Sequence, residues 1–403
     1  MPFLGRAACS AAIALGVVAS PANAQKPANP AVVAVVAESS VDVLHREYRT
    51  VDGRDAILPG AIARSVVRVT IPRALDHDDA AAALARTPLG HPKADTLYYV
   101  SGTRLLVYYG ATAKGSVLTD SFHGTGTTSL AAGRTVGAAP DALVVAVLGY
   151  NQDSWRWVAD QPWIDVATTS TFDVINGALC DSTAAVRAFR RSGHLPFAAA
   201  GNSYVETTVL SPGGYPDVVR VGGVRRDGTT ALPGTEDKDP TLYSARAYDV
   251  GGLFANRIAA AGTISGYTTG TGTSGSAPQI AGRTADLLAR TRVAVGDLGS
   301  GVRRGALVWA SKKVPKRGPL ADGKLTADEL LETVLHVSRP AGNQAVGRYA
   351  IEGYGWFDRA AQIRALAILT GASAAPARAE DDQAHEAALA ARGAYYAAHG
   401  CDL

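Results

Sequence analysis

A short valine-rich run near the amino end constrains the fold more than any other feature of the chain. Residues 31–37 read AVVAVVA, without a polar position. Successive side chains of a strand point to opposite faces of a sheet, so a strand that is apolar throughout is buried on both faces. Such burial is typical of a parallel sheet covered by helices. Further strands are predicted at 142–148, 195–200 and 218–224.

Segments with a helical pattern lie between these strands. Residues 183–192 are amphipathic, apolar side chains recur at helical spacing over 274–292, and the small residues of 124–132 also fit a helix. Strands that alternate with helices predict an α/β fold with a mostly parallel central sheet flanked by helices. A strand is also predicted at 65–71, and a hairpin, which is antiparallel, within 97–109.

The composition fits a globular protein of this class. Apolar residues make up 47% and charged residues 19% of the 403 residues, which argues against disorder. The net charge of +3 is too small for a nucleic-acid-binding surface. Outside the amino terminus, no apolar run reaches the ~18 residues of a membrane-spanning helix. We therefore predict one domain over 25–372, followed by an Ala-rich, charged tail at 373–403.

The first 24 residues have the layout of a secretory signal peptide. Arg6 is their only charged residue, an apolar stretch covers 7–19, and residues 20–24 (SPANA) end in a small-x-small cleavage pattern. A helix that stays in the membrane is the alternative, but the apolar stretch is short for a span. We therefore expect a signal peptide at 1–24 and a secreted protein, periplasmic or extracellular, with no membrane attachment after cleavage.

Two cysteines, Cys180 and Cys401, would remain after removal of this signal. Exported proteins fold in an oxidising compartment, where the two thiols can form a disulfide. Whether they pair depends on the distance between them in the fold, which the sequence does not contain. A buried thiol at Cys180 and a free thiol at Cys401 fit the sequence equally well.

The segment 272–282 (GTSGSAPQIAG) is the first of three motifs that carry chemistry. It places Ser274 at a glycine-rich turn where a helix begins, so that its hydroxyl lies near backbone N–H groups. The small residues of the first turn allow another chain to approach closely. Taken alone, a Ser at this position also fits a helix N-cap.

The other two motifs contain a candidate base and a candidate oxyanion donor. Residues 123–133 (HGTGTTSLAAG) place His123 before a helix whose first turns are small, and His is the usual base for a nucleophilic Ser. Residues 199–202 (AAGN) place Asn202 beyond a buried strand, where its amide can donate to an oxyanion. Taken singly, the two residues also fit a capping His and a turn.

Together the three motifs resemble those of the subtilisin-like serine protease (subtilase) family. The family's nucleophile motif G-T-S-x-A-x-P-x-x-A-G is matched except at Ser276, where Ala is usual, and the order acid, His, Ser also agrees. The resemblance covers about residues 30–370. It implies a subtilisin-like three-layer fold and a serine endopeptidase that acts on protein or peptide substrates without a required cofactor. It also implies Ser274 as nucleophile, His123 as base and Asn202 in the oxyanion hole.

The acid of the triad departs from the family's pattern, which has D-T-G or D-S-G after a buried strand, often with a His several residues later. Aligning the AVVAVVA strand and His45 places Glu38 at the acid position and Ser40 where the Gly stands. Glu can accept the imidazole N–H, but its side chain is one methylene longer. Asp42 and Asp120 are the fallback candidates for the acid.

The predicted substrate-binding strand also departs from the family's pattern, and metal binding stays open. The substrate-pairing strand of subtilases contains S-x-G, whereas residues 170–172 read STF, so Ser170 and Phe172 are the predicted substrate-binding residues. Phe172 would narrow the specificity pocket or block the peptide backbone. Many subtilases bind Ca²⁺, for which the acidic residues 236–239 (EDKD) are a candidate, although such runs are usually only solvated. We assign no metal ligand.

A catalytically impaired pseudoprotease, acting as a secreted binding module, is the alternative function on the same fold. The departures at Glu38, Ser40 and Phe172 favour it, and the presence of His123 and the other two motif residues opposes it. A surface structural protein has only the signal peptide in its favour. Labelling by a fluorophosphonate separates these alternatives, because only an activated serine reacts.

Overall fold

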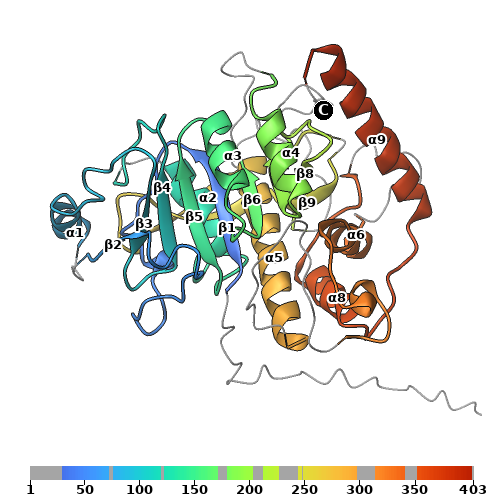
Figure 1. Ribbon diagram of the computed structural model, residues 1–403, viewed down its shortest axis with the longest axis horizontal. Coiled ribbons are helices and arrows are strands. Elements are labelled where there is room, and N and C mark those ends of the chain that lie inside the picture. Colours follow the sequence, from blue (N-terminus) through green and yellow to red (C-terminus); the bar gives the residue numbers. More distant parts are fainter. Residues whose placement is uncertain are drawn as a thin grey trace, which may run out of the picture.

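A nine-stranded sheet forms the centre of the structure, with the strand order β2-β3-β4-β5-β1-β6-β7-β8-β9 (Figure 1). The computed structural model describes residues 30–71, 76–118, 122–170, 179–202, 212–226, 244–246, 248–296, 314–340 and 352–401. The strands are β1 (Val32–Glu38), β2 (Val67–Val69), β3 (Thr96–Val100), β4 (Leu105–Tyr109), β5 (Leu143–Leu148), β6 (Val166–Thr169), β7 (Leu195–Ala199), β8 (Val219–Val224) and β9 (Val250–Leu253). All neighbours pair in parallel except β3 and β4, which form the predicted hairpin. The predicted α/β class with a mostly parallel sheet is confirmed.

The two faces of the central strand β1 belong to different parts of the core. Val33 and Val35 pack on one side of the sheet, and Val32, Ala34 and Val36 pack on the other. Every residue of β1 is buried. A run without polar residues is therefore what this position in the sheet requires, because each face of the strand meets a layer of helices.

Helices cover both faces of the sheet, which gives three layers (Figure 1). The helices α2 (Phe122–Ala132) and α5 (Thr273–Ala294) pack on the side of Val33, and α3 (Asn151–Ala159) and α4 (Thr183–Arg191) pack on the side of Val32. The remaining elements are α1 (His77–Leu84), α6 (Ala327–Val337), α8 (Arg359–Leu369), α9 (Ala379–Ala398), the short 3-10 helices η1 (Arg46–Tyr48) and η3 (Pro319–Asp322), and an antiparallel pair of strands, β10 (Ala255–Ala259) and β11 (Tyr267–Thr271).

The helix α9, within the segment predicted as an Ala-rich tail, is held on the domain by a buried ion pair and an aromatic contact. Arg392 Nη2 lies 2.7 Å from Asp249 Oδ1, and each of the two side chains is 2% exposed. Burial, the largest single effect, acts to raise the pKa of Asp249, but the charges and hydrogen bonds of Arg392 and His385 together outweigh it and hold this pKa well below its usual range. The rings of Tyr396 and Tyr215 pack edge to face with centroids 4.8 Å apart.

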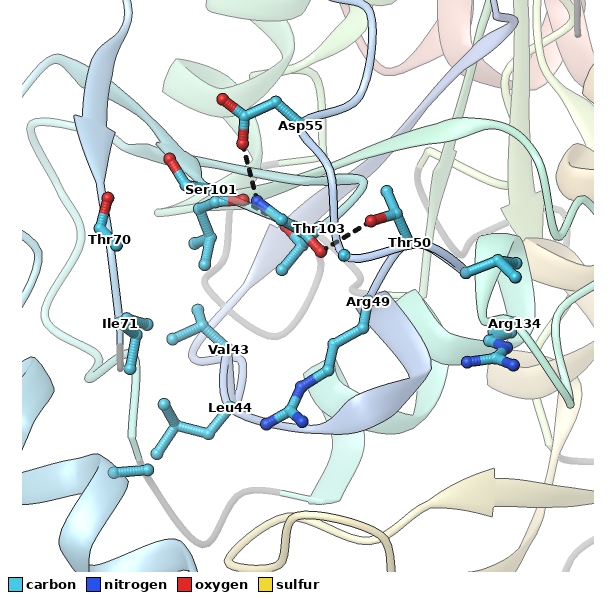
Figure 2. A pocket seen from close by; sticks show the side chains of 15 residues that line it. Val43, Leu44, Arg49, Thr50, Asp55, Thr70, Ile71, Ser101, Thr103 and Arg134 are labelled. Atoms are coloured by element: carbon cyan, nitrogen blue, oxygen red, sulfur yellow. Dashed lines mark hydrogen bonds between the residues drawn. The ribbon is translucent and has the colours of Figure 1, made fainter. Parts of the chain in front are cut away.

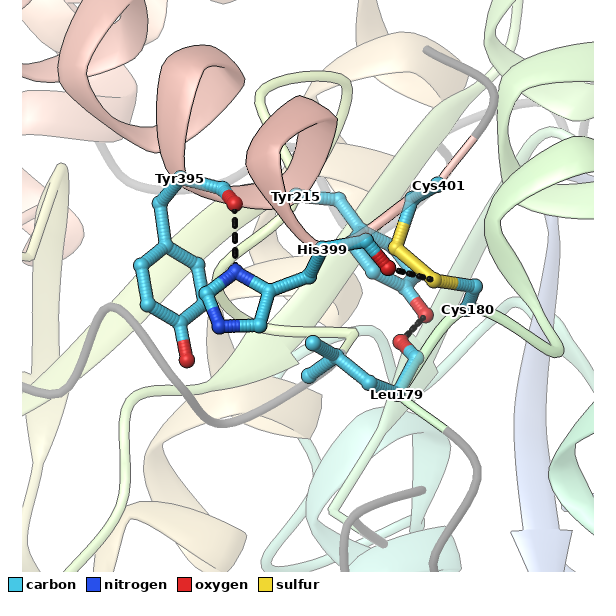
Figure 3. Close-up of a disulfide and its surroundings, with 6 residues drawn as sticks. All are labelled: Leu179, Cys180, Tyr215, Tyr395, His399 and Cys401. Carbon is cyan, nitrogen blue, oxygen red and sulfur yellow. Dashed lines mark hydrogen bonds between the residues drawn. A yellow bond between two sulfur atoms is a disulfide. The ribbon is translucent and has the colours of Figure 1, made fainter.

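A disulfide joins the end of α9 to the segment that precedes α4. Cys401, just after α9, is bonded to Cys180, which precedes α4, and the two Cα atoms are 5.2 Å apart (Figure 3). The sequence left this pairing open because it depends on the fold. The bond, together with the contacts of α9, fixes the carboxyl-terminal segment to the helical layer that contains α4.

Several predicted features lie outside the described residues. These are the signal peptide at 1–24, Asp120, Phe172 and the acidic residues 236–239. Predictions that rest on them stay predictions. Within the described ranges, no helix is both long enough and apolar enough to cross a bilayer.

We expect reduction of the Cys180–Cys401 disulfide to lower the free energy of unfolding by about 2–5 kcal/mol, because the bond closes a loop between residues 221 positions apart. Urea unfolding with and without a thiol-free phosphine reductant measures the change. The variant with both cysteines replaced by Ala is the control, and its midpoint should not respond to the reductant. An unchanged midpoint in the fully reduced protein would contradict the expectation.

Candidate active site

A buried glutamate at the carboxyl end of β1 binds a histidine at the start of α2. The Glu38 side chain is 2% exposed. Its Oε2 atom accepts a hydrogen bond from His123 Nδ1 at 2.9 Å, and its Oε1 atom accepts one from Thr127 Oγ1 at 2.9 Å. His123 and Thr127 are four residues apart on one helix, so their side chains lie on the same face. The predicted acid is thus the hydrogen-bond partner of the predicted base.

A bulge at the end of β1 turns Glu38 toward α2. Strict alternation would point Glu38 to the side of Val36, which packs toward α3 and α4. Instead, the register of β1 shifts between Val36 and Glu38, and Ala37 adopts a left-handed φ of 63°. Such an extra residue reverses the face taken by the next side chain. Val36 and Ala37 therefore both join the α3–α4 side of the core, and Glu38 faces α2.

The start of α2 lies directly against this strand end because a glycine follows His123. A Cβ added at Gly124 would overlap the carbonyl oxygen of Ser40 and would lie 3.3 Å from Glu38 Cβ. Any side chain at this position would force α2 away from β1. The glycine of the motif thus allows the imidazole to reach the carboxylate.

The carboxylate also sets how the imidazole titrates. Coulombic attraction by Glu38 raises the pKa of His123 above its usual value, and this effect outweighs burial, which acts in the opposite direction. A carboxylate only accepts hydrogen bonds, so Nδ1 carries the proton and Nε2 of the neutral ring is a proton acceptor. The His123 side chain is 38% exposed, which leaves the ring accessible to a reactant. This arrangement can act as a general base.

Ser274 lies in the first turn of α5, and Ser170 holds this turn. Pro278, inside the helix, has no N–H and leaves the carbonyl of Ser274, four residues earlier, without its helical donor. The Ser170 hydroxyl donates to that carbonyl at 3.0 Å. Ser276, which stands where subtilases usually have Ala, donates its buried hydroxyl to the carbonyl of Leu253 at 3.0 Å. The structure thus uses the Ser170 hydroxyl inside the protein, and its substrate contact stays a prediction.

Asn202, which follows β7, lies beside the same turn. Its Oδ1 atom accepts hydrogen bonds from the Thr273 backbone N–H at 2.8 Å and from the Thr273 hydroxyl at 3.0 Å. Gly272, with a φ of 123°, permits the close approach, because an added Cβ would lie 3.0 Å from Asn202 Nδ2. With its carbonyl end engaged, the amide presents its N–H donors to another acceptor. An amide fixed next to Ser274 can stabilise a developing negative charge.

His123 and Ser274 do not share a hydrogen bond, although both belong to the described part of the chain. Their helices pack against each other, and Gly275 lies beside the Leu130 side chain of α2. Hydrogen bonds between catalytic groups are often long without substrate and tighten when it binds. The predicted approach of the two side chains therefore stays a prediction.

The fallback acid Asp42 belongs to a different pair. It is fully buried, and its Oδ2 atom accepts hydrogen bonds from His77 Nε2 at 2.8 Å and from the Gly262 N–H at 2.8 Å. Among the described residues, Glu38 is the carboxylate bonded to His123. The pair formed by Asp42 and His77 was not predicted from the sequence, because nothing in the sequence brings these two residues together.

Thr127 is a further residue that the sequence motifs did not single out. It belongs to the run of small residues that follows His123, and in the sequence it fits this run by its size without a role of its own. Its spacing of four residues from His123 in a predicted helix is the signal that places both side chains on one face. The spacing could therefore have identified it.

A cavity of about 560 Å³ lies elsewhere, beside the hairpin of β3 and β4 (Figure 2). Thr70 and Ile71 line it on one side and Arg134 on the opposite side (Figure 2). None of its lining residues is one of the predicted site residues. Among the residues that the structure describes, no group of three or more His, Cys, Asp or Glu side chains is arranged to hold a metal ion.

A known protein family matches the part of the chain that contains three of the predicted site residues. The subtilase family (peptidase S8) matches residues 108–305, a range that includes His123, Asn202 and Ser274 and excludes Glu38. The comparison with curated proteins gave no match.

Three solved structures are similar to this chain. The protease domain of PatA is 14% identical, with a TM-score of 0.49, and the match covers 85% of this chain and 96% of that chain. The prenylagaramide maturation protease PagA is 15% identical, with a TM-score of 0.48 and coverage of 86% and 94%. A cold adapted subtilisin-like serine proteinase is 16% identical, with a TM-score of 0.45 and coverage of 83% and 90%.

We expect the pKa of His123 to lie above the usual value of about 6.5, and we expect Glu38→Gln to lower it. The amide keeps the shape of the side chain but removes the charge that favours the imidazolium. Proton NMR of the imidazole C–H signals over a pH series measures both values, and the His77 signal serves as internal control. Identical titration of His123 in the two proteins would show that Glu38 exerts no such effect.

Proposed function

We propose that the chain is a serine endopeptidase of the subtilase family, which matches residues 108–305, and that it hydrolyses peptide bonds with Ser274, His123 and Glu38. The Ser274 hydroxyl attacks the carbonyl carbon of the substrate while His123 Nε2 takes its proton. The imidazolium then gives this proton to the leaving amine, and an acyl-enzyme remains on Ser274. A water molecule, deprotonated by the same imidazole, hydrolyses the acyl-enzyme and restores the serine.

Asn202 and the backbone N–H of Ser274 form the oxyanion hole of this mechanism. The negative charge of the tetrahedral intermediate develops on the former carbonyl oxygen of the substrate. The hydrogen bonds from Thr273 to Asn202 Oδ1 orient the side-chain amide before substrate arrives. Donors that are already oriented stabilise the transition state without a cost of reorganisation at the moment of reaction.

The observation that carries the proposal is the hydrogen bond between Glu38 Oε2 and His123 Nδ1 at 2.9 Å. The buried carboxylate keeps Nε2 of the neutral imidazole unprotonated and stabilises the imidazolium that forms when Ser274 loses its proton. A pseudoprotease has no need of a buried carboxylate on this nitrogen. The pairing therefore supports catalysis over a binding function, with Glu in the position where the family usually has Asp.

We further propose that the protein is exported and acts outside the cytoplasm on protein or peptide substrates. The signal-peptide layout of residues 1–24 supports export. The disulfide between Cys180 and Cys401 also supports it, because such bonds persist in oxidising compartments. The chemistry of the triad needs no cofactor. A Ca²⁺ ion at residues 236–239 and substrate contacts of Ser170 and Phe172 stay predictions.

We expect Ser274→Ala to abolish peptidase activity and labelling by a fluorophosphonate while the protein stays folded. The N-cap of α5 is Gly272 and no side chain caps this helix, so removal of the Ser274 hydroxyl should lower the free energy of unfolding by less than the ~1 kcal/mol of a capping group. Hydrolysis of a fluorogenic casein substrate and mass spectrometry of the labelled peptide provide the readouts. Ser276→Ala, which restores the family's usual residue, is the matched control and should keep both activities. Labelling of another serine would refute the assignment.

We expect Glu38→Gln to lower kcat by about 10⁴-fold, because loss of the acid's charge in a Ser-His-acid triad has an effect of that size. Glu38→Asp keeps the charge but withdraws the carboxylate from His123 and Thr127. A misplacement of about 1 Å costs about 10²-fold in rate. We therefore expect Glu38→Asp to lower kcat by more than about 10²-fold but by less than the ~10⁴-fold loss of Glu38→Gln. Stopped-flow and steady-state kinetics measure kcat, at a pH high enough that His123 is neutral in each protein. Full activity of Glu38→Gln would rule out this role.

A further inference from the structure

Both oxygens of the Glu38 carboxylate are engaged, and only one of the two donors belongs to the proposed triad. His123 Nδ1 binds Oε2, and the Thr127 hydroxyl binds Oε1 at 2.9 Å. The Thr127 side chain lies in the interior, where it is 4% exposed. Its position, one helical turn after His123, means that a single helix holds both ends of the carboxylate.

The carboxylate is the acceptor that Thr127 favours. The hydroxyl has one proton, and two backbone carbonyls of α2 are also within range, that of His123 at 3.0 Å and that of Gly124 at 3.1 Å. A hydrogen bond to an ionised oxygen is roughly twice as strong as one to a neutral oxygen. Thr has two main χ1 rotamers in a helix, and the one adopted here places the hydroxyl at the Glu38 carboxylate.

Glu38 needs such a second donor more than an aspartate would. Its side chain has one more rotatable bond, so one hydrogen bond to His123 leaves the carboxylate able to turn about that contact. A buried carboxylate oxygen without a donor is also costly. The Thr127 hydroxyl removes this freedom and supplies the missing donor at the same time.

We propose that Thr127 is a positioning residue of the active site, which fixes the Glu38 carboxylate so that it can hold His123. The proposal rests on the proposed role of Glu38 as the acid of the triad. Thr127 does not touch the reacting atoms, and it acts through the charge and the orientation of Glu38. Loss of the Thr127 hydroxyl should therefore reduce stabilisation of the transition state and leave the binding of substrate unchanged.

Thr128, the next residue of the helix, provides the matched control. It is fully buried, and its hydroxyl has no hydrogen-bond partner among the residues that the structure describes. Thr128→Val therefore removes a buried hydroxyl from the same helix without touching Glu38. Thr127→Val makes the same chemical change where the hydroxyl binds the carboxylate.

We expect Thr127→Val to lower kcat by about 10- to 100-fold with KM within about 3-fold of the parent value, as for loss of a hydrogen bond to a charged group. Thr128→Val should change neither parameter by more than about 3-fold, since no hydrogen bond is lost. Thr127→Ser keeps the hydroxyl and should restore most of kcat. If Thr127→Val does not fold, Thr127→Ala is measured in the same way.

The pKa of His123 provides a readout that needs no catalysis. It is measured by NMR in proteins that carry Ser274→Ala, so it stays informative if the proposed peptidase mechanism fails. A carboxylate released by Thr127→Val holds the imidazolium less well, and we expect the pKa of His123 to fall, less than with Glu38→Gln. In the Glu38→Gln background, Thr127→Val should cause no further fall, because there is no charge left to position.

Three outcomes would overturn the proposal. In the first, Thr127→Val and Thr128→Val have equal effects on kcat and on the pKa of His123. In the second, Thr127→Val shifts the pKa of His123 by the same amount in the parent protein and in the Glu38→Gln variant. Thr127 would then act by packing and not through the carboxylate. In the third, Thr127→Ser fails to restore kcat. Failure of the proposed function is distinct, since the parent protein would then lack peptidase activity or Ser274→Ala would keep it.

Discussion

The candidate active site depends on one buried carboxylate and on its need for two hydrogen-bond donors. Removing a charged carboxylate from water is unfavourable unless its oxygens find partners in the protein. Glu38 meets this condition through His123 and Thr127, which lie on the same face of α2. The position of α2 against β1 is thus tied to the ionisation of Glu38, and Gly124 makes the required approach possible.

The parallel sheet brings the other polar groups to the same edge. The strands β1, β6 and β7 are neighbours, and their carboxyl ends lead to Glu38, Ser170 and Asn202. In open α/β sheets, sites form at this edge because the loops that follow the strands converge there. The first turn of α5 then fits between these groups, since Ser170 and the Asn202 amide both bind its backbone.

Burial decides which parts of the structure could be predicted from the sequence. The strands β1 and β5 were predictable because burial on both faces leaves an apolar run. The helix α3 was not predicted, because polar Asn151 and Ser154 take two of its four buried positions and hide their helical spacing. The strand β9, which reads VGGL, was not predicted because it is short and half glycine. The motifs name the candidate residues His123, Asn202 and Ser274, whose catalytic roles stay predictions. The bulge was not predicted, since alanine at Ala37 does not indicate a left-handed φ.

The choice between Glu38 and Asp42 shows the same limit at the level of one residue. Both carboxylates are buried near the end of β1, and both bind a histidine, so residue type and burial do not distinguish them. Only the direction of the backbone after Ala37 decides which of them meets His123. The exchange of Asp for Glu is therefore not a change of one side chain alone. A longer acid requires a strand end that aims it and a donor such as Thr127 that stops it from turning, and these features are absent from the triad motifs.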